Sequence, residues 1–294
     1  MKGFVLNKLQ QEYGTDEQCL DAIKKLRFPD DIPCPKCKQT TKFYHVQKRT
    51  AYACKFCGYH VYPLAGTVLE KTTTPLRYWF YAMFLMTQTR AGISAKQLER
   101  ELGVTYKTAW RMFKHIRLLM VQEGSLLNGT VEIDETFIGG KGMNRKYKPH
   151  FNEIPKEIVM GIVQRGGKAY VKHIPSTGKW VLFKQIKEHV DPKARVMTDQ
   201  FAGYQQLKKQ GYEHNFVNHG ETYVIGDIHT QNVECLWSNL KRGIYGVYRI
   251  VSKKYLQAYI DEYTFRYNHR KTPEHMFTAL LYQLACVKPV RVSA

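Results

Sequence analysis

The 294-residue sequence lacks any apolar run long enough to cross a membrane, and it lacks internal repeats and low-complexity segments. A membrane-spanning helix needs about 20 apolar residues, and the longest apolar patch, residues 78–86, is far shorter. The first residues also lack the apolar core of a secretory signal peptide. These absences predict a soluble, intracellular protein with no membrane partner.

Acidic residues are scarce relative to basic ones. The chain has 45 Lys and Arg against 25 Asp and Glu, a net charge of +20. Residues 1–128 contribute 20 − 10 = +10 and residues 129–294 contribute 25 − 15 = +10, so no single tail carries the excess. Charge spread in this way favours a polyanionic partner, DNA or RNA, over a merely basic enzyme. Hydrophobic residues make up 44% of the chain, which indicates a globular protein.

Cysteine is also sparse, but four of the seven cysteines form two pairs, each with two residues between its members: Cys34 and Cys37, then Cys54 and Cys57. This spacing is typical of a four-thiolate zinc ribbon, with short strands expected at residues 42–46 and 49–53. An intracellular location disfavours disulfides, and two paired motifs disfavour a redox site. The zinc would be structural, because four thiolates leave no open coordination position. The remaining cysteines, Cys19, Cys235 and Cys286, are predicted to be core thiols.

The segments on either side of these cysteines have helical patterns. Residues 1–30 predict helices broken near Gly14, with a fresh N-cap at Thr15 or Asp16. Residues 75–120 also predict helices, and residues 94–117 resemble a helix-turn-helix with its turn at Gly103. Its second helix carries the candidate DNA contacts Lys107, Arg111, Lys114 and Arg117. A plain helical hairpin between domains is the alternative.

The periodicity changes after a predicted linker at residues 124–129. Five strands are expected at residues 130–138, 157–163, 169–174, 194–198 and 214–217. Helices are expected at residues 177–190, 201–210, 229–244, 252–268 and 273–284. Three hairpin-like strands followed by alternating helices and strands predict an α/β layer fold with a mixed sheet.

Three acids stand out in this second half. Asp134 lies in a strand whose apolar neighbours Val131, Ile133 and Phe137 are expected on the other face, and Asp199 directly follows an apolar strand. Glu234 begins an amphipathic helix. Carboxylates are the ligands that Mg²⁺ prefers, and two such ions can promote phosphodiester transfer. Because acids at strand ends are common, the spacing alone favours a structural role over a metal site.

Lys241 follows Glu234 by seven residues, about two helical turns, so the two side chains share a face. The apolar stripe of this helix is formed by Val233, Leu236, Leu240 and Ile244. A carboxylate and an amine on one helical face are an ordinary surface pattern when taken alone.

Taken together, four segments resemble DDE-type insertion-sequence transposases of the zinc-ribbon, ISXO-like branch, which is related to the Merlin elements. The segments are EIDETFIGGK (132–141), TDQFAGY (198–204), HTQNVECLWSNLKRG (229–243) and YTFRYNHR (263–270). With the preceding zinc ribbon they cover nearly the whole chain, and as an ordered set they are specific.

The resemblance implies an RNase H-like catalytic domain, similar to that of retroviral integrases, in which Asp134, Asp199 and Glu234 bind two Mg²⁺ or Mn²⁺ ions. It implies that Lys241 holds DNA phosphate near them. Asn232 is an alternative to Glu234, because some relatives place Asn in the third acidic role. Further candidates are Lys141 and Arg242 as DNA contacts and His219, His229 and Trp237 as site-lining residues.

The neighbouring acids Glu132 and Glu135 are not expected to be ligands, and Glu135 should point away from Asp134. Cys235 stands where the resemblance would place a glycine.

The implied function is metal-dependent cleavage and strand transfer at transposon ends by a homodimer or higher synaptic oligomer in a prokaryotic cytoplasm, near the nucleoid. Its partners would be double-stranded transposon ends and target DNA. The implied domains are a helical segment (1–30), a zinc ribbon (31–66), a helix-turn-helix-like DNA-binding region (67–123), a catalytic domain (128–284) and a tail (285–294). Two alternatives are a non-catalytic or domesticated DNA-binding regulator and a structure-specific nuclease of the same fold.

Overall fold

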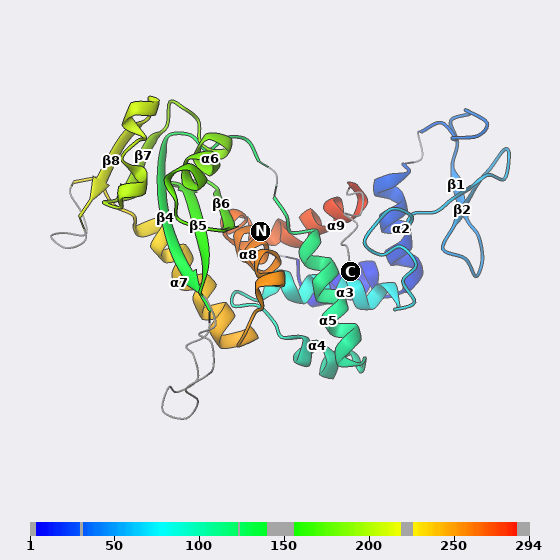
Figure 1. The fold of residues 1–294 in the computed structure, drawn as a ribbon. Helices are drawn as coiled ribbons and strands as arrows, with labels where there is room; N and C mark the ends of the chain where they lie inside the picture. Colours follow the sequence, from blue (N-terminus) through cyan, green and yellow to red (C-terminus); the bar gives the residue numbers. More distant parts are fainter. Residues whose placement is uncertain (1–3, 30–31, 123, 140–155, 219–225, 287–294) are drawn as a thin grey trace. The chain divides into compact units, whose positions relative to one another are not determined.

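A computed structural model describes residues 4–29, 32–122, 124–139, 156–218 and 226–286. The chain divides into two compact units, a first unit of Met1–Met120 with Thr272–Ala294 and a sheet unit of Val121–Lys271 (Figure 1). Over the described ranges, every helix is too short or too polar to cross a membrane.

Among the described residues, the first unit has six α-helices, and four begin where the sequence predicts; the first has no predicted start, and the last begins three residues after the predicted residue 273. They are α1 (Leu6–Tyr13), α2 (Asp16–Arg27), α3 (Leu76–Gln88), α4 (Ala95–Leu102), α5 (Tyr106–Leu118) and α9 (Met276–Cys286). Thr15 caps α2 and forms a reciprocal capping box with Gln18. Ser94 and Thr105 cap α4 and α5, and Gly103 ends α4 in the left-handed conformation, with φ of 65°. The predicted helix-turn-helix elements are therefore present.

Helix α9 belongs to the first unit, whereas the sequence assigned residues up to 284 to the catalytic domain. The reason is aromatic packing. The ring of Phe277 stacks on Phe4, with centroids 4.5 Å apart, and meets Phe80 and Phe84 edge-on. The chain thus returns to its N-terminal helices after completing the sheet unit.

The cysteine-containing segment forms a small antiparallel sheet of β1 (Phe43–His45), β2 (Tyr52–Cys54) and β3 (His60–Val61). The first two strands were predicted, and the third was not. The Arg27 guanidinium donates 2.6 Å hydrogen bonds to the carbonyls of Pro63 and Ala65. The Tyr52 hydroxyl also donates to the Asp21 carboxylate, so helix α2 is tied to this ribbon.

The sheet unit contains five strands in the order β6-β5-β4-β7-β8. They are β4 (Thr130–Ile138), β5 (Glu157–Gln164), β6 (Ala169–Ile174), β7 (Arg195–Asp199) and β8 (Glu213–Val217). Strands β4, β5 and β6 are antiparallel, and β7 and β8 join β4 in parallel. The predicted mixed sheet is confirmed, and this order is that of an RNase H-like fold.

Two parts of this unit differ from the prediction. Residues 201–210 form two short 3₁₀ turns, η1 (Ala202–Tyr204) and η2 (Lys208–Gln210), in place of one helix. The predicted linker 124–129 is partly ordered against the sheet unit, because Leu127 is buried and exchanges backbone hydrogen bonds of 2.8 Å with His189 and Asp191.

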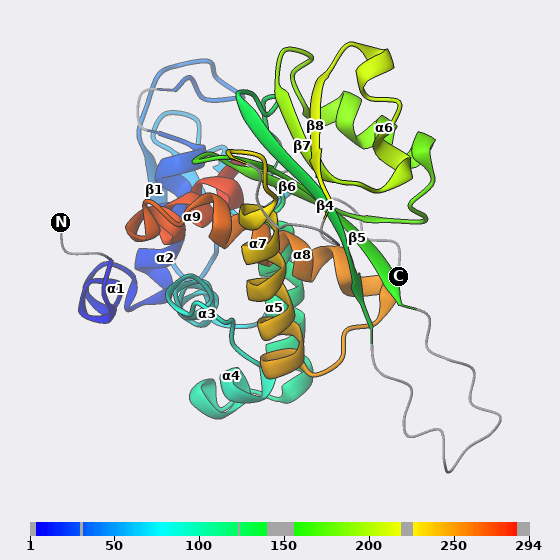
Figure 2. The same ribbon diagram turned by 90° about the vertical axis from the view of Figure 1, so that its left-hand side faces the viewer.

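Each face of the sheet has its own apolar cluster. Val131, Ile133 and Val196 pack with α6 (Lys179–His189) on one face. Ile138, Val159 and Val171 pack on the other face with α7 (Gln231–Gly243), η3 (Ile244–Tyr248) and α8 (Lys253–Asn268) (Figure 2). The last short turn, η4 (Pro273–His275), precedes α9. Helix α7, which carries Glu234, therefore covers the face of β4 opposite to Val131 and Ile133.

Candidate active site

The four paired cysteines converge in the first unit. Their sulfur atoms all lie within 4.8 Å of one another, with 3.7 Å between Cys34 and Cys57 and 3.8 Å between Cys37 and Cys54. A tetrahedral site with Zn–S bonds of about 2.3 Å requires sulfurs about 3.8 Å apart. The donor set and its spacing therefore fit a structural zinc ion.

The other cysteines lie outside this cluster. Cys19 is buried and its thiol faces the Tyr13 carbonyl at 3.4 Å, as predicted for a core thiol. Cys235 and Cys286 are exposed, so that prediction is wrong for both. Cys235 occupies the solvent side of α7, where its side chain causes no crowding against the sheet.

Asp134 and Asp199 lie on neighbouring parallel strands at the same level. Thr130 pairs with Arg195 and Glu132 with Met197, so continuing this register by two residues sets Asp134 beside Asp199. Paired residues of adjacent strands are about 4.8 Å apart and direct their side chains to the same face. The backbone N–H of Phe201 donates a 2.9 Å hydrogen bond to Asp199 Oδ1 and orients that carboxylate.

Asp134 is held from above by the indole of Trp237, whose Nε1–H donates a 2.8 Å hydrogen bond to Asp134 Oδ2. Burial, with a smaller contribution from the charges of Asp199 and Glu234, raises the pKa of Asp134 to about 6, although the Trp237 hydrogen bond opposes the shift. The charges of both other acids act on Asp134, as expected for three carboxylates in one region of the sheet unit.

Glu234 lies in the first turn of α7 on an exposed position, and its Oε1 accepts a 2.9 Å hydrogen bond from the Thr230 hydroxyl. Over the described ranges, the cysteine cluster is the only group of three or more potential ligands within 4.8 Å of one another. The three acids are thus near neighbours, but their oxygens are farther apart than those of a closed metal site.

Gly161 provides the room that Trp237 occupies. It pairs with Asp134 across β4 and β5, and a Cβ at this position would lie 2.6 Å from Trp237 Cη2 and 2.7 Å from Cζ2. The indole reaches Asp134 only because residue 161 has no side chain. No sequence motif marked this glycine, which lies inside an otherwise ordinary apolar strand.

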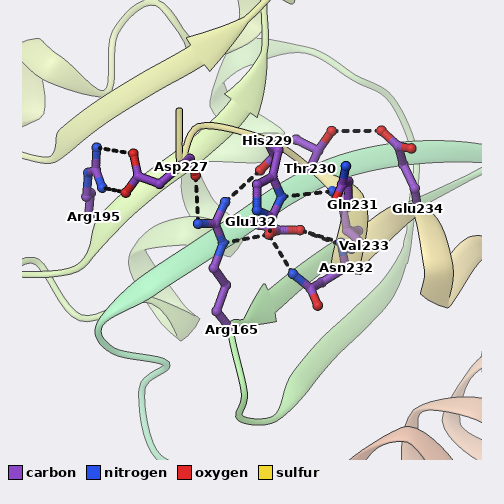
Figure 3. Close-up of polar contacts among 10 residues, drawn as sticks. All are labelled: Glu132, Arg165, Arg195, Asp227, His229, Thr230, Gln231, Asn232, Val233 and Glu234. Carbon is purple, nitrogen blue, oxygen red and sulfur yellow. Dashed lines mark hydrogen bonds and ion pairs between the residues drawn. The ribbon is translucent and has the colours of Figure 1, made fainter. Parts of the chain in front are cut away.

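The carboxylate of Glu132 has no solvent exposure and is bonded to several neighbouring residues, as drawn in Figure 3. It accepts hydrogen bonds of 2.7 Å from Arg165 Nε and 2.8 Å from Asn232 Nδ2. His229 Nδ1 lies 3.2 Å from Glu132 Oε1. The side chains of Asn232 and His229, considered as site-lining from the sequence, are thus directed to Glu132.

Glu135 points to the opposite face from Asp134, as predicted from strand alternation. Its carboxylate accepts a hydrogen bond from the hydroxyl of Tyr204, which is fully buried beneath the sheet. Burial, together with the charges of Asp134 and Asp199 and against the Tyr204 hydrogen bond, raises the pKa of Glu135 to about 7. A second acid therefore lies within electrostatic reach of the Asp134–Asp199 pair without joining it.

The candidate basic residues have different surroundings. On α7, Lys241 is half-buried, and the exposed Arg242 donates a 2.7 Å hydrogen bond to Asn239 Oδ1. Lys141 and His219 lie outside the described residues.

On α5, Lys107 is exposed, Lys114 lies over the Trp110 ring at 5.8 Å and Arg111 donates to the Thr74 hydroxyl at 2.8 Å. Arg117 is only 3% exposed, and its guanidinium lies 5.8 Å from the Phe113 ring centroid. Arg117 is thus a core residue in this structure and is unavailable to DNA, contrary to the sequence prediction.

Two family models match parts of this chain. Residues 126–268 match the model of the ISXO2-like transposase domain, and residues 14–60 match the transposase zinc-ribbon domain. The chain therefore contains an ISXO2-like transposase domain preceded by a transposase zinc ribbon. The matched residues include the three acids, the whole sheet and all four zinc-ribbon cysteines.

Two curated relatives are similar to this chain. An uncharacterized protein in transposable element ISH50 of Halobacterium salinarum is 27% identical over 273 residues, which span 86% of this chain and 91% of the relative. An uncharacterized transposase-like protein of Haemophilus influenzae is 24% identical over 102 residues, 35% of this chain and 82% of the relative.

Two solved structures show weaker likeness at 14% identity. One is a simian T-cell lymphotropic virus intasome in complex with PP2A regulatory subunit B56 gamma, with a TM-score of 0.29 over 61% of this chain and 66% of that chain. The other is a Mos1 transposase paired-end complex with left transposon end, with a TM-score of 0.25 over 75% of this chain and 82% of that chain.

Proposed function

We propose that the protein is a DNA transposase that cleaves transposon ends and joins them to target DNA at a divalent-metal site formed by Asp134, Asp199 and Glu234. The observation that carries the proposal is the register of β4 and β7, which sets Asp134 beside Asp199 beneath the helix that bears Glu234. The match of residues 126–268 to the ISXO2-like transposase domain supports the reaction class.

The donor set suits hard divalent ions such as Mg²⁺ or Mn²⁺, because all three candidate ligands are carboxylates. Bound ions would stabilise charge on the attacking and leaving oxygens of the scissile phosphodiester. Their positive charge would also favour the ionised form of Asp134, whose pKa is raised first by burial and then by the charges of Asp199 and Glu234. Three carboxylates gathered in this way would be suited to bind divalent ions.

The protein's own groups orient these carboxylates. The Trp237 indole fixes one oxygen of Asp134, and the Phe201 N–H fixes one oxygen of Asp199. Lys241, two turns after Glu234 on the same side of α7, is suited to hold a DNA phosphate beside them. Positioning of this kind supplies much of the catalysis in phosphoryl transfer.

DNA would be bound mainly through charge. The net charge of +20 is spread over the chain, and Lys107 is exposed near the start of the second helix of the helix-turn-helix. We assign recognition of the terminal inverted repeats to the zinc ribbon and the α4–α5 region, and contact with flanking and target DNA to basic residues of the sheet unit, including Arg242 and Lys141. Because two ends must be joined, the active form would be a dimer or larger synaptic assembly.

A strand-transfer assay tests the proposal. A labelled duplex carrying the inverted repeat that flanks the gene is incubated with target plasmid and Mg²⁺ or Mn²⁺, beside the Asp134→Ala variant. The expected result is labelled DNA covalently joined to plasmid by the wild-type protein alone. Cleavage without joining would identify a nuclease of the same fold, and binding without cleavage would identify a DNA-binding regulator; either result rejects the proposal.

A further inference from the structure

The first turn of α7 lacks the local cap that helices usually have. Its N-cap residue is Thr230, whose side chain caps no backbone N–H and donates instead to Glu234 Oε1 at 2.9 Å. The first four N–H groups of a helix have no partner within the helix. In α7 these N–H groups lie next to Glu234, a candidate metal ligand. The groups that accept their hydrogen bonds therefore affect the position of Glu234.

Glu132 of strand β4 takes the place of the missing cap. Its Oε2 accepts the backbone N–H groups of Asn232 at 2.7 Å and Val233 at 3.2 Å, the second and third residues of the helix (Figure 3). Its Oε1 accepts the Asn232 side chain at 2.8 Å. A carboxylate at this end of a helix also interacts favourably with the helix dipole. The residue that immediately follows these two anchored amides is Glu234.

Glu132 is itself held by Arg165, whose guanidinium also contacts the segment that precedes α7. Arg165 donates Nε–H to Glu132 at 2.7 Å, Nη1–H to the Asp227 carbonyl at 2.7 Å and Nη2–H to the His229 carbonyl at 3.0 Å. The Asp227 carboxylate is held in turn by the guanidinium of Arg195 on β7. These contacts join the approach to α7 to strands β4 and β7 and to the turn after β5.

The placement of Glu132 on β4 connects this network to the acids. It precedes Asp134 by two residues, so both side chains lie on the face that α7 covers. About one turn after Glu234, Trp237 donates its indole N–H to Asp134 itself. Strand β4 therefore holds α7 at two points, and the Glu132 contact is the one adjacent to Glu234.

We propose that Glu132 is a positioning residue: it caps α7 from the neighbouring strand and thereby sets Glu234 opposite Asp134 and Asp199 for shared metal binding. This inference rests on the proposed function, since it assigns Glu234 a metal. It also explains why a carboxylate that binds no metal is fully buried beside the acids, because each of its oxygens is occupied by donors from α7, its preceding segment or Arg165.

The test compares Glu132→Gln with Glu262→Gln in the full-length protein. Glu262 is a matched control because it is equally buried in the same unit and is likewise paired with an arginine, Arg266, at 2.6 Å. Gln at position 132 keeps the size of the side chain but loses the charge and presents an amide N–H₂ to groups that are themselves donors. Two quantities are measured. The first is the hydrogen-exchange rate of the Asn232 and Val233 amides. The second is the Mn²⁺ dissociation constant of the binding event that Asp134→Ala abolishes.

In Glu132→Gln, we expect the two amides to exchange on the order of tenfold faster and Mn²⁺ affinity to fall by about 10–100-fold. Glu262→Gln should leave both quantities unchanged, even if it lowers stability. Unchanged Mn²⁺ affinity in Glu132→Gln would overturn the inference.

If Glu132→Gln does not fold, Asn232→Ala removes one of the same contacts, and its Mn²⁺ affinity should fall in the same direction; an unchanged value would overturn the inference. If Asp134→Ala binds Mn²⁺ like the wild type, the proposed function fails first. If Asp134→Ala loses Mn²⁺ but Glu132→Gln does not, the inference alone fails.

Discussion

Replacing Gly161 by alanine should separate α7 from strand β4 at the candidate active site. The new Cβ would lie 2.6 Å from Trp237 Cη2, 2.7 Å from Trp237 Cζ2 and 3.1 Å from Val233 Cγ2. Carbon atoms pack at about 3.5–4.0 Å, so the indole must retreat by roughly 1 Å. The 2.8 Å hydrogen bond from Trp237 to Asp134 would then stretch beyond useful length.

The size of the effect follows from two costs and one small gain. Overpacking of this kind costs about 1–3 kcal/mol, and losing a hydrogen bond to a charged group costs about 1.5–3 kcal/mol. Replacing glycine stabilises by about 0.4–1 kcal/mol through the unfolded chain. Because one movement relieves the clash and breaks the bond, we expect a net loss of about 2–4 kcal/mol, measured as a urea midpoint lower by roughly 1–2 M.

Gly246→Ala is the matched control, since a Cβ there meets nothing within 4 Å. Its free energy of unfolding should stay within about 0.5 kcal/mol of the wild type or rise slightly. The contact itself is tested in the Trp237→Phe background, where Cζ2 and Cη2 are absent and Gly161→Ala should cost less than half as much. Equal costs in the two backgrounds would refute the packing argument.

Three further predictions concern pH, zinc and DNA. Burial and the neighbouring acids raise the pKa of Asp134 to about 6, so the folded state holds this proton more tightly than the unfolded state. The free energy of unfolding of the metal-free protein should therefore fall by up to about 3 kcal/mol as pH rises from about 4 to 6. The Asp134→Asn variant should show a smaller decline over the same pH range. The raised pKa of Glu135, about 7, should extend the remaining decline toward neutral pH. Replacing Cys57 by serine should abolish one bound zinc per chain, measured by elemental analysis, while urea unfolding of the sheet unit persists; retained zinc would contradict the four-thiolate site. Lys107→Ala should reduce the slope of log K for DNA binding against log salt by about 1, whereas Arg117→Ala, at a buried residue, should lower the melting temperature instead.

Much of the fold could be predicted because local chemistry determines it. Thr15, Ser94 and Thr105 have hydroxyls that cap backbone N–H groups, and these mark three helix starts. Alternation of apolar residues located strand β4 to the residue. The membership of α9 in the first unit could not be predicted, because its aromatic partners Phe4, Phe80 and Phe84 lie more than 190 positions earlier in the chain and any apolar cluster could have accepted it.

The candidate site likewise contains some residues that the sequence indicates and others that it does not. Residue types and the family resemblance indicated Asp134, Asp199 and Glu234, but only the strand register sets the first two side by side. The role of Glu132 depends on a helix 100 residues later, and Gly161 depends on the reach of one indole, so neither leaves a local signal. Arg117 was misassigned although a signal existed: it follows Ile116 and lies one turn after Phe113, both on the buried side of α5.

Nicking of supercoiled plasmid in Mn²⁺ tests whether the three acids form one metal-dependent site. Wild-type protein is compared with Asp134→Asn, Asp199→Asn and Glu234→Gln, after DNA binding by each variant has been measured. We expect all three variants to bind DNA like the wild type and none of them to nick it. Nicking at the wild-type rate by any one of them would contradict the assignment of that acid, and at position 234 it would transfer the role to Asn232.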